Sequence, residues 1–433
     1  MRIAVALPSL EATAPHRRSI DAMLRHIVDA GHDVEGFAEH DRTEDEGPFA
    51  IFHYLRMPER HGEHPFDVGL YPIGRDASPY QGVFSLMHRF PSAVWFLDPI
   101  VHHLAVGGVA LMDDWVGYRA LLDETYGPTG AALAQTVASN WGTGALFRRY
   151  DLVPALAASQ RRVLAAWPAL AARISDRLDD RPVGVAPLGL GDSALDLPRG
   201  EIRRVSIMTI NESYATTAVR AAAAAIELGP DISVRVCMSK PIYKAEGARV
   251  AAHLGIDDRV DWVFTSLPER LAETAAGSDA LVWLAEELEG RHRLLLVQGM
   301  ADGRVTFVPR TSLYDDIPEG SVVGLALGHT LARSFGALLR AVVEDRSLRE
   351  SLVLHGRAFA HACPDTKRAA DLLVSELQEC AASGPVEMSP VSGPTWAKVD
   401  AENIAAATPA GASSEVRRRV AEILRSQTEP FRP

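Results

Sequence analysis

Residues 205–238 read VSIMTINESYATTAVRAAAAAIELGPDISVRVCM, and the fold prediction starts from this stretch. The apolar run 205–210 has the length and composition of a buried strand. An alanine-rich helix is expected at 216–228, where a Gly-Pro pair ends it. A second strand is expected at 233–238. Strand, helix and strand in this order predict two parallel strands joined by a helical crossover.

The same alternation continues on both sides of this stretch. Downstream, strands are expected at 260–264, 280–284 and 305–309, and helices at 245–254, 269–276, 294–300, 328–344, 347–361 and 366–381. Upstream, strands are expected at 2–7, 33–37, 66–71, 93–98 and 183–187, with a first helix at 19–30. The segment 115–174 is rich in Ala, Leu and Arg, and its spacing predicts several helices.

Between the two alternating units lies a joint rich in Gly, Pro and Asp, GLGDSALDLPRGE at 189–201. We therefore expect an α/β protein with two doubly wound, Rossmann-like domains, at 1–190 and 201–381. The segment 382–433 changes to Ala, Ser, Gly, Pro and Thr, which predicts a linker or extended arm that ends in a short basic amphipathic helix.

Composition narrows the function. The 433 residues are 47% apolar and 23% charged, which is ordinary for a globular protein. With 44 basic and 56 acidic residues the formal charge is −12, so generic nucleic-acid binding is not expected. Three cysteines without motif spacing favour a reducing, cytoplasmic setting. Neither a signal peptide nor a membrane-spanning segment is predicted. Peripheral membrane association and homo- or hetero-oligomers stay open.

Two motifs in this order carry a family resemblance. In the first half, FDVGLYPIGRDASPYQGVFSLMHRFPSAVWFLDPIVHHL at 66–104 places Asp98 after a strand and a His-His-Leu ending after it. In the second half, GIDDRVDWV at 255–263 is followed by EGRHRLLLVQGMADGRVTFV at 289–308. Their order and spacing resemble the family-4 glycosyltransferases of GT-B fold, many of them bacterial, over roughly 1–381.

The resemblance implies a retaining glycosyltransferase without an obligatory metal or cofactor, whose donor substrate is a nucleotide diphosphate-sugar. It implies that the second domain binds the donor and the first binds a small-molecule, glycan or protein acceptor. By position it implies Glu289 at the donor sugar, Gln298 at the ribose and Asn211 near the diphosphate. Lys240, Lys244, Arg291 and Arg293 are candidates to replace the cations that the family places around the diphosphate. Asp98 and either His102 or His103 would face the acceptor.

The chain departs from the family pattern at several of these positions. Gln298 stands where the family has a ribose-binding Glu, one residue too far from Glu289. Tyr214 stands where the family has a phosphate-binding Lys. The loop after the first strand lacks the usual glycine, and a loop without Gly cannot bring its backbone as close to a phosphate.

Each residue also has an ordinary structural interpretation. Glu289 is equally consistent with a carboxylate at a helix start, and Asp98 with a helix cap. Residues 291–293 are consistent with an exposed charged turn before a helix at 294–300.

Three functions therefore stay open at this point: a divergent transferase, a catalytically silent GT-B protein that binds or stabilises a partner transferase, and a sugar-phosphate isomerase or epimerase.

Overall fold

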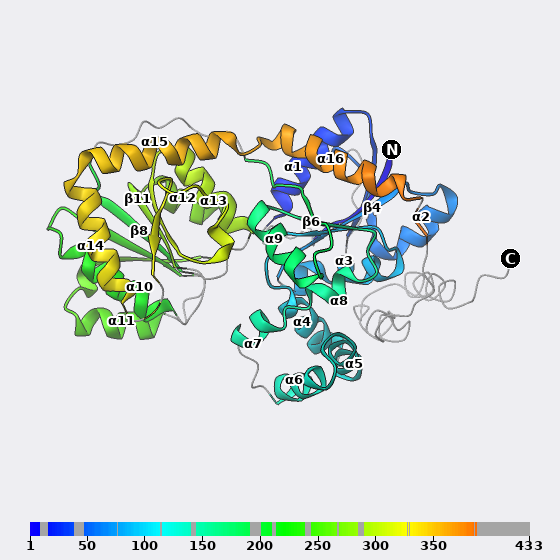
Figure 1. Ribbon diagram of the computed structural model, residues 1–433, viewed down its shortest axis with the longest axis horizontal. Helices are drawn as coiled ribbons and strands as arrows, with labels where there is room; N and C mark the ends of the chain where they lie inside the picture. Colours follow the sequence, from blue (N-terminus) through cyan, green and yellow to red (C-terminus); the bar gives the residue numbers. More distant parts are fainter. Residues whose placement is uncertain are drawn as a thin grey trace, which may run out of the picture.

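The computed structural model describes residues 1–8, 16–38, 47–75, 77–112, 115–139, 144–190, 201–209, 214–238, 244–265, 268–284, 290–326, 328, 330–384 and 386–387. Two parallel sheets lie side by side, each with helices on its faces (Figure 1). None of the helices in these ranges is long and apolar enough to cross a membrane. Of the arm predicted at 382–433, residue 385 and residues 388–433, which include the terminal helix, lie outside the described residues.

The first sheet has the strand order β3-β2-β1-β4-β5-β6-β7. Its strands are β1 (Arg2–Ala6), β2 (Asp33–Ala38), β3 (Ile51–His53), β4 (Val68–Ile73), β5 (Ala93–Phe96), β6 (Arg162–Ala165) and β7 (Gly184–Val185). Its helices are α1 (Arg17–Asp29), α2 (Met57–Glu63), α3 (Ala77–Arg89) and α9 (Pro168–Arg177). A helical group projects from it (Figure 1): α4 (His102–Met112), α5 (Trp115–Tyr126), α6 (Pro128–Ala138), α7 (Gly144–Arg149) and α8 (Val153–Ala157).

The second sheet has the order β10-β9-β8-β11-β12-β13. Its strands are β8 (Arg204–Thr209), β9 (Ser233–Met238), β10 (Val260–Phe264), β11 (Ala280–Leu284), β12 (Val305–Pro309) and β13 (Val323–Leu325). Its helices are α10 (Ala215–Ile226), α11 (Lys244–His253), α12 (Pro268–Ala276), α13 (Gly290–Ala301), α14 (Leu331–Glu344) and α15 (Arg346–Ala362). Every residue of β5 and β11 is buried, as expected for strands covered on both faces. The predicted α/β class with two doubly wound parallel sheets is confirmed.

Three strands were not predicted. β6 lies inside the segment 115–174, for which only helices were predicted, and it pairs with β5 from Ala93↔Arg162 onward. β6 is only four residues long, and an Ala- and Leu-rich strand of that length has no period that separates it from a helix. β3 and β13 are three residues each and extend the two sheets at their edges.

The last described helix, α16 (Thr366–Ala382), crosses from the second domain to the first. It packs against α1 and β4, and Arg162 Nε of β6 donates to Glu376 Oε2 at 2.8 Å. Figure 1 shows α15 leading into α16 above both sheets. The sequence grouped this helix with the second domain by chain order, whereas its contacts lie with the first.

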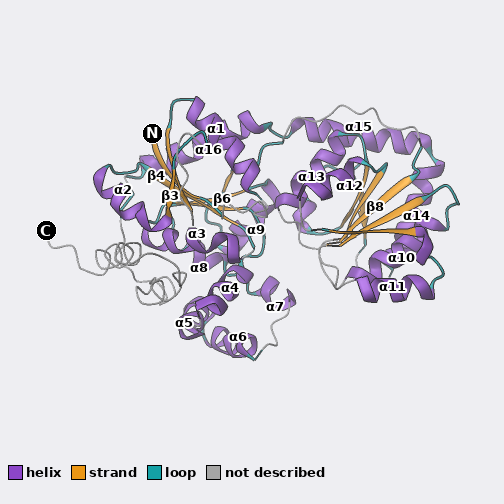
Figure 2. Ribbon diagram, turned by 180° about the vertical axis from the view of Figure 1, so that it is seen from behind, coloured by secondary structure: helices purple, strands orange, loops and turns teal. Residues whose placement is uncertain are grey.

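One hydrophobic cluster spans both domains, and the second domain has a further cluster of its own. The buried apolar cluster of the first sheet continues into α13, the 3-10 turn Ser312–Tyr314 and α16 without interruption. On the first-domain side, α9 contacts that turn, and Figure 2 shows α9 and α13 between the two sheets. This side of the interface is largely apolar, and it helps to set how the two sheets face each other.

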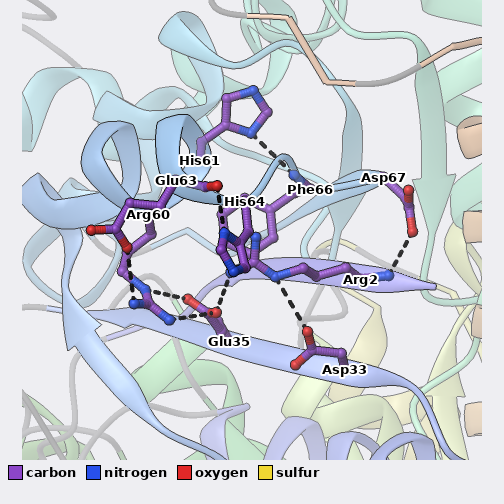
Figure 3. Close-up of polar contacts among 9 residues, drawn as sticks. All are labelled: Arg2, Asp33, Glu35, Arg60, His61, Glu63, His64, Phe66 and Asp67. Atoms are coloured by element: carbon purple, nitrogen blue, oxygen red, sulfur yellow. Dashed lines mark hydrogen bonds and ion pairs between the residues drawn. The ribbon is translucent and has the colours of Figure 1, made fainter.

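A network of ion pairs and hydrogen bonds connects β1 and β2 to α2 in the first domain (Figure 3). Glu35 of β2 is 6% exposed, and its carboxylate accepts from Arg60 Nε and Nη2, both at 2.9 Å. It also binds the Arg2 guanidinium of β1. Burial alone would raise the pKa of Glu35, but the bonds and charges of the two arginines outweigh it and lower the pKa.

Candidate functional site

The two domains meet where β5 ends and α13 begins. Gly290, the first residue of α13, donates its backbone N–H to the Leu97 carbonyl at 3.0 Å and to Asp98 Oδ1 at 2.8 Å. Any side chain at this position would clash, since a Cβ on Gly290 would lie 2.5 Å from the Leu97 oxygen and 3.0 Å from His16 Cε1. Gly290 is therefore fixed by close approach of two backbones rather than by turn geometry.

Asp98 is the polar centre of this contact. Besides Gly290, it accepts the backbone N–H of Arg75 on Oδ2 at 2.8 Å, and His16 Nε2 lies 3.6 Å from Oδ1. Burial would raise the pKa of the Asp98 carboxyl, but His16 and the two amides outweigh burial and hold the pKa below its ordinary value of 3.8. Asp98 is thus a carboxylate at physiological pH although it is only 3% exposed.

The position of Asp98 matches the electrostatics of the helix start. The N-terminal end of a helix carries partial positive charge and free amides, so it binds anions. Here the anion is a carboxylate from the other domain, 192 residues earlier in the chain. Asp98 is therefore a helix cap, as its structural interpretation expected. The helix that it caps is α13, however, and not α4, the next helix in the chain. In this arrangement the carboxylate is closed to solvent, and a role toward an acceptor would require the domains to separate.

The two adjacent histidines of α4 face different surroundings. His102 is fully buried: Nδ1 donates to the Tyr150 carbonyl, so in the neutral ring Nε2 accepts from the Tyr118 hydroxyl at 2.6 Å. Its ring stacks on Phe147. Burial lowers the pKa of His102 to about 4, and burial with the Arg75 charge lowers the pKa of His103 to about 3. Both are neutral at pH 7, and His102 connects α4 to α5 through Tyr118 and to α7 through Phe147.

This placement predicts a stability effect. His102→Phe keeps the ring but leaves the Tyr118 hydroxyl and the Tyr150 carbonyl without their buried partner, which should lower the free energy of unfolding by about 2–3 kcal/mol. Urea unfolding at pH 7 measures this. His103→Phe, at the half-buried neighbour, is the matched control and should change stability by less than about 1 kcal/mol. Equal effects of the two substitutions would contradict the assignment.

Arg293 and Gln298 of α13 each bond to a carboxylate of the second domain. The Arg293 guanidinium binds Asp316 at 2.7 Å and lies over the Phe359 ring, 5.5 Å from its centre. Gln298 Nε2 donates to Asp302 Oδ1 at 3.1 Å, and it stands about 12 Å along the helix from Gly290. The predicted exposed turn at 291–293 is wrong, because α13 begins at Gly290 and buries His292 and Arg293.

The remaining predicted donor residues are not placed. Glu289, Asn211 and Lys240 lie outside the described residues. Lys244 begins α11 and Arg291 follows Gly290 in α13, but their side chains lie outside the description as well. No group of three or more His, Cys, Asp or Glu side chains placed to hold a metal occurs in the part of the chain that is described.

Sequence reasoning missed His16, Arg75 and Gly290 as members of the Asp98 contact. Gly290 stood in a quoted motif and Arg75 follows a strand end, where ligand sites of parallel sheets lie. No local pattern, however, shows that these positions meet, because the bond between Gly290 and Asp98 joins separate domains.

No protein-family model and no curated protein matches the sequence, but solved structures match its fold. Sucrose-phosphate synthase from Thermosynechococcus elongatus is 11% identical, with a TM-score of 0.59 over 89% of this chain and 100% of that one. A glycosyltransferase from Rickettsia africae ESF-5 is 10% identical, with a TM-score of 0.56 over 88% and 99%.

HepE from Anabaena, in complex with UDP and glucose, is 14% identical, with a TM-score of 0.53 over 88% of this chain and 100% of that one. At such low identities these similarities concern the fold. They agree with the two facing parallel sheets described above, and the chain therefore has the GT-B fold that the sequence predicted.

Proposed function

We propose that this protein is a glycosyltransferase that moves a sugar from a nucleotide diphosphate-sugar to an acceptor held by the first domain. The observation that carries the proposal is the contact between the N-terminal end of α13 and the C-terminal edge of the first sheet. In this contact the start of α13, which can bind an anion, lies opposite the C-terminal edge of the first sheet, where parallel sheets bind ligands. The fold similarity to sucrose-phosphate synthase and HepE supports it.

The chemistry of sugar transfer fits such a helix start. When the bond between the anomeric carbon and the diphosphate breaks, negative charge builds on the departing phosphate oxygen. Fixed amide donors and the helix dipole stabilise that charge without reorganisation. In the described arrangement Asp98 occupies the first amide of α13. We therefore infer that a donor diphosphate competes with Asp98 for α13, so that donor binding loosens the contact between the domains.

We further assign a retaining mechanism, as the family resemblance implies. Glu289 is proposed at the donor sugar, with Asn211, Lys240, Lys244 and Arg291 around the diphosphate. Arg293 is proposed as support for α13 through Asp316 rather than as a phosphate ligand, because its guanidinium is already paired and buried. UDP is the first nucleotide to test, since it is bound in the HepE structure.

A second candidate is a GT-B protein without activity that stabilises another transferase. It is favoured by the internal pairing of Arg293 with Asp316 and of Gln298 with Asp302, which removes two predicted donor contacts. Such a protein would neither bind a nucleoside diphosphate nor hydrolyse a nucleotide sugar, and it would co-purify with a partner transferase.

Nucleotide binding separates the two candidates. At a nucleoside diphosphate concentration of 100 times its Kd, an active donor site adds about 2.7 kcal/mol to the free energy of unfolding. We expect UDP, or another nucleoside diphosphate in a thermal-shift panel, to raise the melting temperature, and the matching nucleotide sugar to be hydrolysed slowly. No shift with any nucleoside diphosphate would rule out the transferase.

Substitution then tests the assigned residues. Glu289→Ala should lower hydrolysis of the nucleotide sugar by about 100-fold while the shift with the nucleoside diphosphate persists. Arg291→Ala should weaken both, because it removes a charge at the phosphates. Arg259→Ala, at an exposed 3-10 turn of the same domain, is the control and should change neither. Unchanged turnover in both site variants would refute the assignment.

A further inference from the structure

His16 lies beside the contact between Asp98 and α13 without a hydrogen bond for its ring. It is the residue before α1, its side chain is fully buried, and that side chain does not cap α1. Both ring nitrogens lack a hydrogen-bond partner in the part of the chain that is described. A buried polar group without a partner costs free energy, so a histidine kept at this position calls for an explanation.

The imidazole ring touches both partners of the contact. His16 Nε2 lies 3.6 Å from Asp98 Oδ1, the same oxygen that accepts the Gly290 amide at 2.8 Å. The ring atoms Cε1 and Nδ1 lie 3.0 and 3.5 Å from where a Cβ on Gly290 would lie. A charge-assisted N–H···O bond is about 2.7–2.9 Å long, so Nε2 has to approach Oδ1 by less than about 1 Å to form one. His16 is therefore placed to replace Gly290 as a donor to Asp98.

The charge that faces His16 comes from the first domain. Asp98 faces it from the end of β5, and α13 faces it with Gly290. Arg17 is the next residue, but its guanidinium is bonded to the loop after β1 and within α1 itself. Arg75 gives its backbone N–H to Asp98, and its charge acts on α4. Among the described residues, the protonation of His16 is thus governed mainly by the carboxylate of Asp98.

A donor diphosphate would change this balance in one direction. If it takes the Gly290 amide, Asp98 loses one of its two backbone donors, and its negative charge is less compensated. The diphosphate also brings negative charge of its own to the start of α13, next to the ring. Both changes favour the protonated form of an imidazole. Histidine is the side chain whose charge responds to such a change near neutral pH.

We propose that His16 takes Asp98 over from Gly290 when the donor diphosphate binds, and that His16 takes up one proton in this exchange. The proton comes from solution and goes to the ring nitrogen that carries none in the neutral form. The imidazolium then donates from Nε2 to Asp98 Oδ1, and its positive charge lies near the diphosphate. Because the exchange requires a bound diphosphate, it rests on the proposed function, to which it adds a dependence of donor binding on pH.

Calorimetry in buffers of different ionisation enthalpy measures this proton uptake. UDP is the probe, replaced by another nucleoside diphosphate if the thermal-shift panel selects one. At pH 7.5 the wild type should take up about 0.5 proton or more per UDP bound, and its affinity should fall about fivefold from pH 7.0 to 8.5. His16→Gln keeps a neutral N–H donor but cannot be charged, so its uptake should be below about 0.1 proton. His26→Gln, about 15 Å further along α1, is the control and should behave like the wild type.

The outcomes separate this exchange from the proposed function. If no nucleoside diphosphate binds the wild type, the donor site is absent and the exchange is refuted with it. Binding without proton uptake, or uptake that persists in His16→Gln, would overturn the exchange and leave the transferase in place. Should His16→Gln fail to fold, spectra of wild-type protein labelled with ¹⁵N-histidine decide. One imidazole should change from the neutral to the protonated pattern on binding, and unchanged histidine signals would refute the exchange.

Discussion

Gly290→Ala is expected to lower nucleotide-sugar turnover by about 100-fold, although it adds only one methyl group. The added Cβ would lie 2.5 Å from the Leu97 carbonyl oxygen, which is backbone and cannot rotate away. Either α13 or the end of β5 must move, so the Gly290 amide no longer lies where the donor diphosphate is proposed to take it from Asp98. A displacement of about 1 Å at the helix start that we propose to hold the departing phosphate is enough for a loss of this size.

The effect should be local to the contact between the domains. Hydrogen exchange should rise at the first turn of α13, and the melting temperature should fall modestly, because each sheet keeps its own strands. Gly229→Ala is the control, since a Cβ there meets no atom within 4 Å. It should leave turnover and exchange unchanged. Wild-type turnover in Gly290→Ala would mean that the contact between Gly290 and Leu97 has no part in the reaction.

Asp98→Asn examines the same contact from the other side. The two oxygens of Asp98 accept different amides, Gly290 on Oδ1 and Arg75 on Oδ2. Asn offers one oxygen and one NH₂ group, so one backbone N–H would face another donor. The expected loss of interaction free energy is about 1–3 kcal/mol. Part of it lowers the free energy of unfolding, and part of it weakens the contact between the domains.

The parts of the fold that the sequence predicted have strong local periods. β8, α10 and β9 lie within one or two residues of the predicted ranges, because the two strands are mostly apolar runs of strand length and the Gly229-Pro230 pair ends the helix. β6 was missed since four residues, Arg162–Ala165, carry no period. The start of α13 was missed because Gly290 is a poor helix former, kept there by the tertiary contact with Leu97.

The candidate site was harder to predict for a physical reason. Motif order located Asp98 at a strand end, but its partners depend on how two domains dock, which no local pattern encodes. Arg293 illustrates the converse: its position in the motif indicated a phosphate ligand, while the structure pairs it with Asp316 in a buried site. A charged residue at a helix start can serve a ligand or the protein's own core, and residue type alone does not distinguish them.

Glu35→Gln is expected to lower the free energy of unfolding by about 2–4 kcal/mol at pH 7, the largest stability change that we predict. The carboxylate of Glu35 holds two guanidinium groups, those of Arg2 and Arg60, in a nearly buried site (Figure 3). Gln keeps the shape but loses the charge and one acceptor, so Arg2 and Arg60 lose their shared buried counter-ion and are left with the more exposed Asp33 and Glu63. Glu63→Gln is the matched control, because Glu63 binds the same Arg60 at 3.3 Å but is 54% exposed. Its removal should cost less than about 1 kcal/mol.

The pH dependence gives a sharper test of the same network. The pKa of Glu35 is lowered in the folded protein from an ordinary value of 4.5. The unfolded chain therefore takes up the proton first as the pH falls, and the stabilisation present above pH 4.5 is lost as the pH passes through the folded pKa. The gap in unfolding free energy between wild type and Glu35→Gln should be full at pH 7 and shrink below pH 4.5, when wild-type Glu35 becomes neutral too. A gap that stays constant down to pH 3 would mean that the negative charge of Glu35 is not what holds β1, β2 and α2 together.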